Sequence, residues 1–174
     1  MKSTGVIRRI DELGRIVIPK EIRKNLNIRE GENLEIIIES NNIILTKHSP
    51  LFNIESIIKK LEENLSEIIT DTILITDREK IIASSNQEYL NKNISCLVNF
   101  IDNRENYISK ELESFKIGEE ELKGYFTIVP IISFSDCFGL IIIVSNNYLK
   151  KENELLGKLV AKIISNKIDI SWKV

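Results

Sequence analysis

Basic side chains crowd the amino-terminal end of this chain. Residues 1–29 carry eight of them against three acidic side chains, whereas residues 51–174 carry 15 basic and 19 acidic ones. The net charge of −2 is therefore the sum of a positive first segment and a negative second one. The eight are Lys2, Arg8, Arg9, Arg15, Lys20, Arg23, Lys24 and Arg29. An arginine fork can clasp a phosphate or the O6 and N7 edge of guanine, and a lysine provides a compact positive charge. The asymmetry indicates an anionic partner for the first segment, and a solvated basic surface without function is the alternative on charge alone.

The other reactive side chains predict neither catalysis nor metal binding. Cys96, Cys137 and the single histidine, His48, have neither the pattern of a disulfide framework nor metal-ligand spacing. We expect both thiols to be reduced and buried. The carboxylate run at residues 119–121 has no partner residue for acid–base chemistry, and we expect it in a solvated loop. We therefore predict no enzyme activity, no cofactor and no metal ion.

Length and composition allow one ordinary domain or two small ones. The chain has 174 residues, of which 43% are hydrophobic and 29% charged, enough apolar side chains for a core. No apolar stretch approaches the roughly 18 residues of a membrane span, and no apolar segment typical of a secretory signal follows Met1. We expect a cytoplasmic protein with no membrane partner.

The first fifty residues predict short strands and one short helix. Predicted strands cover residues 5–10, 16–18, 34–39 and 43–47. The turn-rich residues 11–15 separate the first two strands, and a helix of about two turns starts at Pro19, with Ile22 and Leu26 on one face. Gly14 suits a tight loop that places Arg15 at its tip. So small a chain cannot bury enough apolar surface alone, and we expect a second copy to complete its core.

A second domain, over residues 51–174, is expected to be α+β. We place the boundary at Ser49-Pro50, with Ser49 as N-cap of a helix that carries an apolar seam. That seam is Ile54, Ile58, Leu61 and Leu65, and a closing helix repeats the pattern with Leu156, Val160, Ile163 or Ile164, and Ile168. Predicted strands cover residues 71–76 and 80–84, a polar helical or loop region covers 89–121, and strands 125–134 and 138–145 form a hairpin joined by 135–137. We expect the two helices to share one sheet face and to add a dimer seam.

One long motif carries a family resemblance. Residues 2–23 read KSTGVIRRIDELGRIVIPKEIR, and the pattern continues through Leu26, Ile28, Gly31, residues 34–36 and residues 43–45. This string resembles the AbrB family of bacterial transition-state regulators. The resemblance implies that residues 1–50 form a swapped-hairpin β-barrel from two chains and that this barrel binds promoter DNA. It implies DNA contacts at Arg8, Arg15, Arg23 and Lys24, and to these we add Arg9 and Lys20 as candidates.

The second domain resembles a GAF domain. Residues 126–132 and 138–144 are similar to the closing hairpin of that fold. Among AbrB-like proteins of this length, the arrangement resembles sporulation regulators with a GAF-like second half, which implies late, forespore gene expression. We expect the GAF-like domain to supply oligomerisation, and its fold implies a small-molecule effector. Where it pairs with a different chain than the first domain does, a dimer of dimers follows, and we expect a homotetramer. Candidate ligand contacts are Asn99, Asp102, Arg104 and Tyr107.

Two other functions remain open from the sequence. The same small barrel occurs in antitoxins of toxin–antitoxin pairs, although these normally append a short disordered tail instead of a structured domain. A metabolite-sensing or enzymatic GAF protein, with the barrel only as dimeriser, is the second alternative. Binding of duplex DNA distinguishes a regulator from both.

Overall fold

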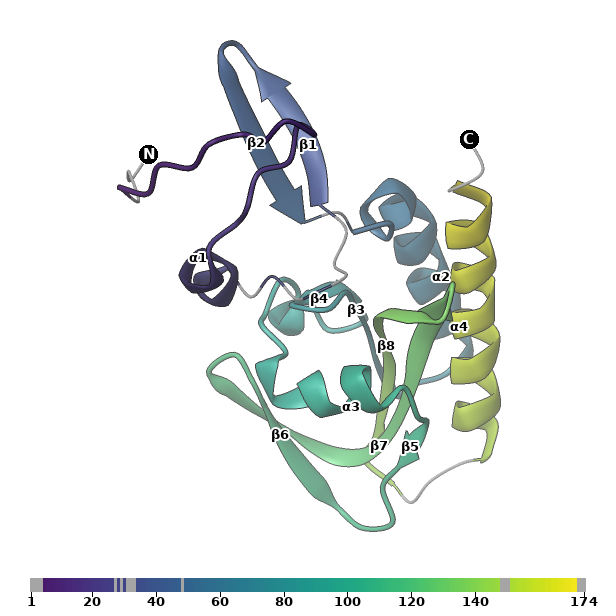
Figure 1. Ribbon diagram of the computed structural model, residues 1–174. Helices are drawn as coiled ribbons and strands as arrows, with labels where there is room; N and C mark the ends of the chain where they lie inside the picture. Colours follow the sequence, from purple (N-terminus) through teal and green to yellow (C-terminus); the bar gives the residue numbers. More distant parts are fainter. Residues whose placement is uncertain are drawn as a thin grey trace. The chain divides into compact units, whose positions relative to one another are not determined.

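The structure is a computed structural model that describes residues 5–26, 28, 30, 34–47, 49–147 and 151–171. The chain divides into two compact units, Met1–His48 and Ser49–Val174 (Figure 1). No helix of the described residues is both long enough and apolar enough to cross a membrane.

The amino-terminal unit contains one short helix and one hairpin. Helix α1 spans Lys20–Asn25, with Pro19 as its N-cap residue, and strands β1 (Leu34–Glu39) and β2 (Asn42–Lys47) pair antiparallel. Ser40 adopts a positive φ of 55° in the turn between the strands, a conformation typical of hairpin turns. The predicted helix and the last two predicted strands are therefore confirmed.

The predicted strands at residues 5–10 and 16–18 are not formed within the single chain. Both segments lie outside any helix or strand, and the backbone bond from Asp11 N–H to the Arg15 carbonyl joins them at their turn. A strand exists only with a neighbour that satisfies its backbone groups. The prediction was wrong for one chain because these segments have no adjacent strand in it.

The carboxyl-terminal unit is built on a six-stranded antiparallel sheet. Its path runs β4-β3-β8-β7-β5, and β6 pairs with the first part of β7. The strands are β3 (Thr72–Thr76), β4 (Ile81–Ser84), β5 (Tyr107–Ile108), β6 (Glu113–Ile117), β7 (Glu120–Ser133) and β8 (Asp136–Ser145). The helices are α2 (Glu55–Ile68), α3 (Val98–Asn103) and α4 (Lys151–Ser171), with short 3₁₀ turns at Phe52–Ile54, Gln87–Tyr89 and Ser95–Leu97.

The two faces of this sheet carry separate cores. Helices α2 and α4 lie side by side over one face, where Ile58 and Ile164 pack among residues of β3, β7 and β8 (Figure 1). On the other face, α3 and β6 cover a cluster that includes Ile101, Leu140 and Ile142. Strand β8 is buried along nearly its whole length because both faces are covered. The mixed α+β architecture and the shared face of the two helices agree with the sequence prediction.

Several local predictions need correction. Ser49 does not cap α2, because a 3₁₀ turn intervenes and α2 begins at Glu55 with Ile54 as its N-cap. On α4, Ile164 is fully buried and faces the core, whereas Ile163 is only partly buried. Cys137 is buried as expected, but Cys96 is exposed, because it lies in a 3₁₀ turn at the surface.

The region predicted as polar helix or loop contains two strands. Strand β6 pairs with residues 120–124 of β7, so most of the carboxylate run lies in a strand and not in a loop. Ion pairs hold it there, from Lys92 to Glu120 and from Lys123 to Glu121. The β7–β8 turn also differs from its prediction: it is made by Phe134 and Ser135, both with positive φ, and strand β8 already begins at Asp136.

Strand β8 carries a glycine whose Cα faces the backbone at the end of β3. The amide of Leu140 donates a hydrogen bond to Thr76 Oγ1 at 3.1 Å, and a Cβ added to Gly139 would lie 1.9 Å from the carbonyl oxygen of Thr76. Backbone meets backbone at this point, so neither side can relax by changing a rotamer.

Replacing Gly139 by Ala should therefore destabilise the protein by about 3 kcal/mol, the upper part of the usual overpacking cost. The matched control is Gly157→Ala in α4, where the new Cβ would lie 3.0 Å from Cγ2 of Val129, a side chain able to shift, and where Ala gains about 1 kcal/mol in helix propensity. Urea unfolding followed by far-UV circular dichroism measures both. Equal midpoints for the two variants would contradict the close approach.

Candidate nucleic-acid interface

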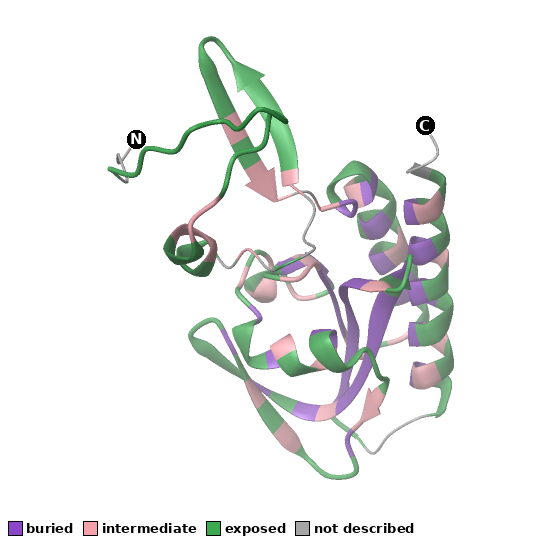
Figure 2. Ribbon diagram, in the orientation of Figure 1, coloured by how far each residue is buried: buried purple, intermediate pink, exposed green. Residues whose placement is uncertain are grey.

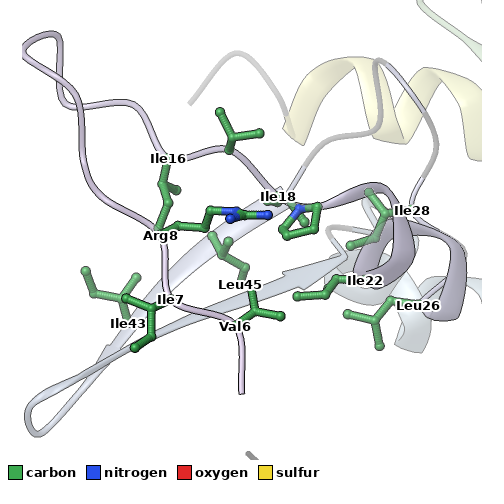
Figure 3. Close-up of a pocket in the computed structure, with 12 residues that line it drawn as sticks. Val6, Ile7, Arg8, Ile16, Ile18, Ile22, Leu26, Ile28, Ile43 and Leu45 are labelled. Carbon is green, nitrogen blue, oxygen red and sulfur yellow. The ribbon is translucent and has the colours of Figure 1, made fainter. Parts of the chain in front are cut away.

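The amino-terminal unit has no core of its own. Not one of its described residues is buried, and twelve of its large apolar side chains are exposed (Figure 2). Several of them line an open groove of about 550 Å³ (Figure 3). The groove is lined by Val6, Ile7, Arg8, Ile16, Val17, Ile18, Pro19, Ile22, Leu26, Ile28, Ile43 and Leu45. An apolar surface of this kind marks a site that another surface covers.

Two of the candidate arginines are involved in this half-formed core. Figure 3 shows Arg8 extending among the apolar side chains of the groove, as its one charged lining residue. Arg23, on α1, is half-buried, and its Nε is enclosed with no hydrogen-bond partner in the described part of the chain. A buried donor without a partner costs roughly 1–3 kcal/mol. Arg23 therefore has an unmet hydrogen bond that an anionic or carbonyl group could satisfy.

Arg15 lies in a loop that is tightly closed by Asp11. Oδ1 of Asp11 accepts the amides of Leu13 at 3.0 Å and Arg15 at 2.8 Å, and Oδ2 accepts Nε of Arg15 at 2.7 Å. Gly14 takes a positive φ of 75° and donates its amide to the Asp11 carbonyl. Gly14 thus makes the tight turn expected of it, but Arg15 closes the loop and does not form its tip. The amide bonds and the Arg15 side chain lower the pKa of the Asp11 carboxyl.

The remaining candidate cations are exposed and unpaired. Arg9 precedes the loop, and Lys20 and Lys24 lie on α1. Within the described residues, neither these three nor Arg8 or Arg23 form an ion pair. The six candidates thus come from three segments: the stretch before the loop, the loop itself and α1. Charges free of internal carboxylates can neutralise phosphates and release their counterions.

Sequence reasoning missed Asp11 as a part of this surface. The available signal was an aspartate four residues before an arginine with a glycine between them, since Asp side chains bond the backbone of following residues and Gly permits the left-handed turn. That pattern predicts a closed loop. It does not predict that the second carboxylate oxygen binds the guanidinium.

Of the four candidate ligand contacts of the second unit, Arg104 and Tyr107 already have partners inside the protein, and Asn99 and Asp102 are exposed on α3. Arg104 binds the carbonyl of Ser135 and lies 3.4 Å from the carboxylate of Asp136. Tyr107 donates to Glu113, which raises the pKa of this phenol to about 12. Aromatic rings pack beside them: Phe115 meets both Phe100 and Phe126 edge to face, and Phe100 lies tilted against Tyr107.

A cavity of about 120 Å³ lies elsewhere in this unit, at the β3–β4 turn. None of its lining residues was predicted from the sequence to contact a ligand. They are Ser49, Leu51, Phe52, Glu55, Asp77, Lys80, Ile82 and Asn91. Burial raises the pKa of Asp77 there. The structure therefore gathers polar groups at a place other than the one expected for a ligand.

Comparison with known proteins assigns both units. The model of the stage V sporulation protein T carboxyl-terminal region, a transcription factor, matches residues 53–168, and the model of the antidote-toxin recognition protein MazE, a bacterial antitoxin, matches residues 7–51. Stage V sporulation protein T of Bacillus subtilis (strain 168) is 38% identical over 161 residues, which cover 88% of this chain and 90% of that protein.

Two relatives from the same bacterium match the amino-terminal unit alone. The transition state regulatory protein AbrB is 54% identical over 50 residues, or 29% of this chain and 52% of AbrB. The putative transition state regulator Abh is 48% identical over 50 residues, or 29% of this chain and 54% of Abh. The resemblance read from the opening residues is confirmed: the chain belongs to the stage V sporulation protein T family of transcription factors, with an AbrB-type domain at its amino-terminal end.

Proposed function

We propose that this protein is a sequence- and shape-selective regulator that binds promoter DNA through its amino-terminal unit. One observation carries the proposal. The AbrB-type unit carries six candidate cationic side chains, all but the half-buried Arg23 exposed, and five of the six form no ion pair among the described residues. These are Arg8, Arg9, Lys20, Arg23 and Lys24, and Arg15 completes the proposed surface. No helix-turn-helix is present among the described residues of this unit, so a loop-and-strand surface with substantial shape readout would contact the duplex.

A second copy of the chain would complete the amino-terminal unit. Among the described residues the groove is apolar apart from Arg8, and the segments before and after the Asp11–Arg15 loop belong to no strand. A swapped-hairpin barrel of two chains meets both needs, because each chain would supply strands and apolar side chains to the other. In such a dimer every cationic side chain occurs twice, on either side of a two-fold axis.

The carboxyl-terminal unit, which we take to be GAF-like, would supply a second interface. The outer faces of α2 and α4 expose Ile57 and Ile68 on the first helix and Leu155, Leu159 and Ile170 on the second. Leu155 and Leu159 are four residues apart, and Ile170 follows three turns later on the same face. Pairing through this surface with a chain other than the barrel partner would give a dimer of dimers.

The biological setting follows from the relative that spans most of the chain. That protein is named for stage V of sporulation, and we place this regulator in late, forespore gene expression. A small-molecule effector of the GAF-like unit would need different affinities for DNA-bound and free states. Arg104 and Tyr107 could contribute only by leaving their present partners.

The antitoxin alternative rests on the match of residues 7–51 to the MazE model. A compact unit of its own, with two buried cores, follows that segment here. A chain that neutralises a toxin through a flexible tail has no use for such a unit, and the relative at 38% identity spans both units. We therefore favour the regulator over the antitoxin and over a metabolite-sensing enzyme.

Binding of the full chain to duplex DNA across a salt titration tests the function. Four cationic positions per chain (Arg8, Arg15, Arg23 and Lys24) give eight in a dimer, and with half of them on phosphates the log–log salt slope should be about −4. Lys24→Ala removes two phosphate contacts per dimer, so it should weaken binding to every duplex and flatten the slope by about 2. The control, Lys60→Ala, removes the same charge from exposed α2 and should leave the slope unchanged. A wild-type chain with no salt-dependent duplex binding would contradict the function.

The oligomeric state tests the second interface. Leu159→Glu puts a charge in the centre of the exposed α4 stripe and should convert tetramers into dimers, because an unpaired carboxylate cannot be buried cheaply. Lys158→Ala changes the net charge equally at a position about 100° around the helix, where it breaks only a surface pair with Glu154. Sedimentation equilibrium measures the mass. Tetramers that survive Leu159→Glu would place the second interface elsewhere.

A further inference from the structure

The loop from Asp11 to Arg15 is organised around a single carboxylate. Asp11 receives three hydrogen bonds, two from backbone amides on Oδ1 and one from Nε of Arg15 on Oδ2. Its backbone joins the Arg15 carbonyl and the Gly14 amide in two further bonds. Asp11 therefore holds both the loop backbone and the side chain of Arg15, which lies four residues after it.

The bond to Nε determines which donors of Arg15 remain available. A guanidinium has five N–H donors, and with Nε engaged the four donors on the two Nη atoms remain for another acceptor. The Arg15 side chain is 71% exposed, so an acceptor from outside the chain can reach it. Two parallel Nη donors match the O6 and N7 acceptors of guanine in the major groove. Fixing the fork in advance also reduces the conformational entropy lost on binding.

A contribution to stability does not explain the charge on Asp11. An exposed ion pair contributes little to stability, and the two amide bonds on Oδ1 need only a carbonyl-type oxygen, which Asn also provides. A carboxylate on a surface that meets phosphates is repelled by them. The carboxylate oxygen Oδ2 thus serves Nε of Arg15 alone. Among the described residues, no carboxylate holds Arg9, Lys20 or Lys24 in this way.

We propose that Asp11 is a positioning residue that holds Arg15 for end-on recognition of a guanine in the major groove, while the unanchored cations contact phosphates. The inference rests on the proposed DNA-binding function and deepens it, because it separates the residue that reads sequence from those that supply affinity. The more firmly Asp11 fixes the guanidinium of Arg15, the more the loop contributes to sequence specificity.

The test compares Asp11→Asn with Glu12→Gln in the full chain. The first keeps Oδ1 as an acceptor for both amides but replaces Oδ2 by an NH₂ group that cannot accept from Nε. The second removes the same charge at the neighbouring position, where Glu12 is exposed and has no bond to the rest of the described chain. The probes are a duplex selected from a random pool by the wild-type chain and an unrelated duplex of equal length.

The quantity measured is the ratio of the two dissociation constants, unrelated over selected. Both variants should bind the unrelated duplex more tightly, because each removes a repulsive charge. Glu12→Gln should leave the ratio unchanged, whereas Asp11→Asn should lower it about tenfold, within the range of one bidentate base contact. Replacing guanine by 7-deazaguanine in the selected duplex, which removes N7, should reduce wild-type binding more than binding of Asp11→Asn.

A double-mutant cycle separates positioning from loop folding. Arg15→Lys keeps the charge but has neither Nε nor a fork, so adding Asp11→Asn to it should lower the ratio no further. Equal ratios for Asp11→Asn and Glu12→Gln would overturn the inference and leave the DNA-binding function intact. Loss of the dimer in Asp11→Asn, measured by light scattering, would also overturn it, because the carboxylate would then serve folding. Absence of duplex binding by the wild-type chain would remove the function and this inference together.

Discussion

Burial of apolar side chains is the constraint on which the amino-terminal unit depends. Twelve large apolar side chains are exposed there, and α1 contributes no buried residue. Covering them would contribute on the order of 10 kcal/mol per chain, comparable to the whole stability of a small domain. The unit therefore reaches a stable fold only with another surface against the groove. In the dimer proposed above, that surface is a second copy of the chain, and each cationic side chain then occurs twice across a two-fold axis.

The carboxyl-terminal unit meets the same constraint within one chain. Strand β8 is covered on both faces, by α2 and α4 on one and by α3 and β6 on the other, so its side chains are divided between two cores. The aromatic series Phe100, Phe115 and Phe126 fills the second core. Any ligand that entered beside Tyr107 would have to displace packed rings or break the bond to Glu113.

Sequence patterns predicted the elements whose partners are local or apolar. The seams of α2 and α4, the β1–β2 hairpin and the β7–β8 hairpin all follow from periodicity, because each buries a regular face. Strand β6 was missed, since its alternation is short and its strand partner in β7 carries the carboxylates of residues 120 and 121. The turn at Phe134 was missed because a bulky residue with positive φ has no sequence signature. The strands expected at residues 5–10 and 16–18 did not form for another reason: neither segment pairs with a strand among the described residues.

The candidate cations show how one residue type takes different roles through its surroundings. All six positions could be named from the sequence, since charge and motif are visible there, but the state of each guanidinium could not. Nε of Arg15 is satisfied by Asp11, whereas Nε of Arg23 is enclosed without a partner among the described residues and Arg8 extends into an apolar groove. Filling that groove would remove water from Arg8 and raise the free-energy cost of leaving its charge unpaired. Completing the core and binding an anion are then energetically coupled, because whatever covers the groove increases the need for a phosphate beside it.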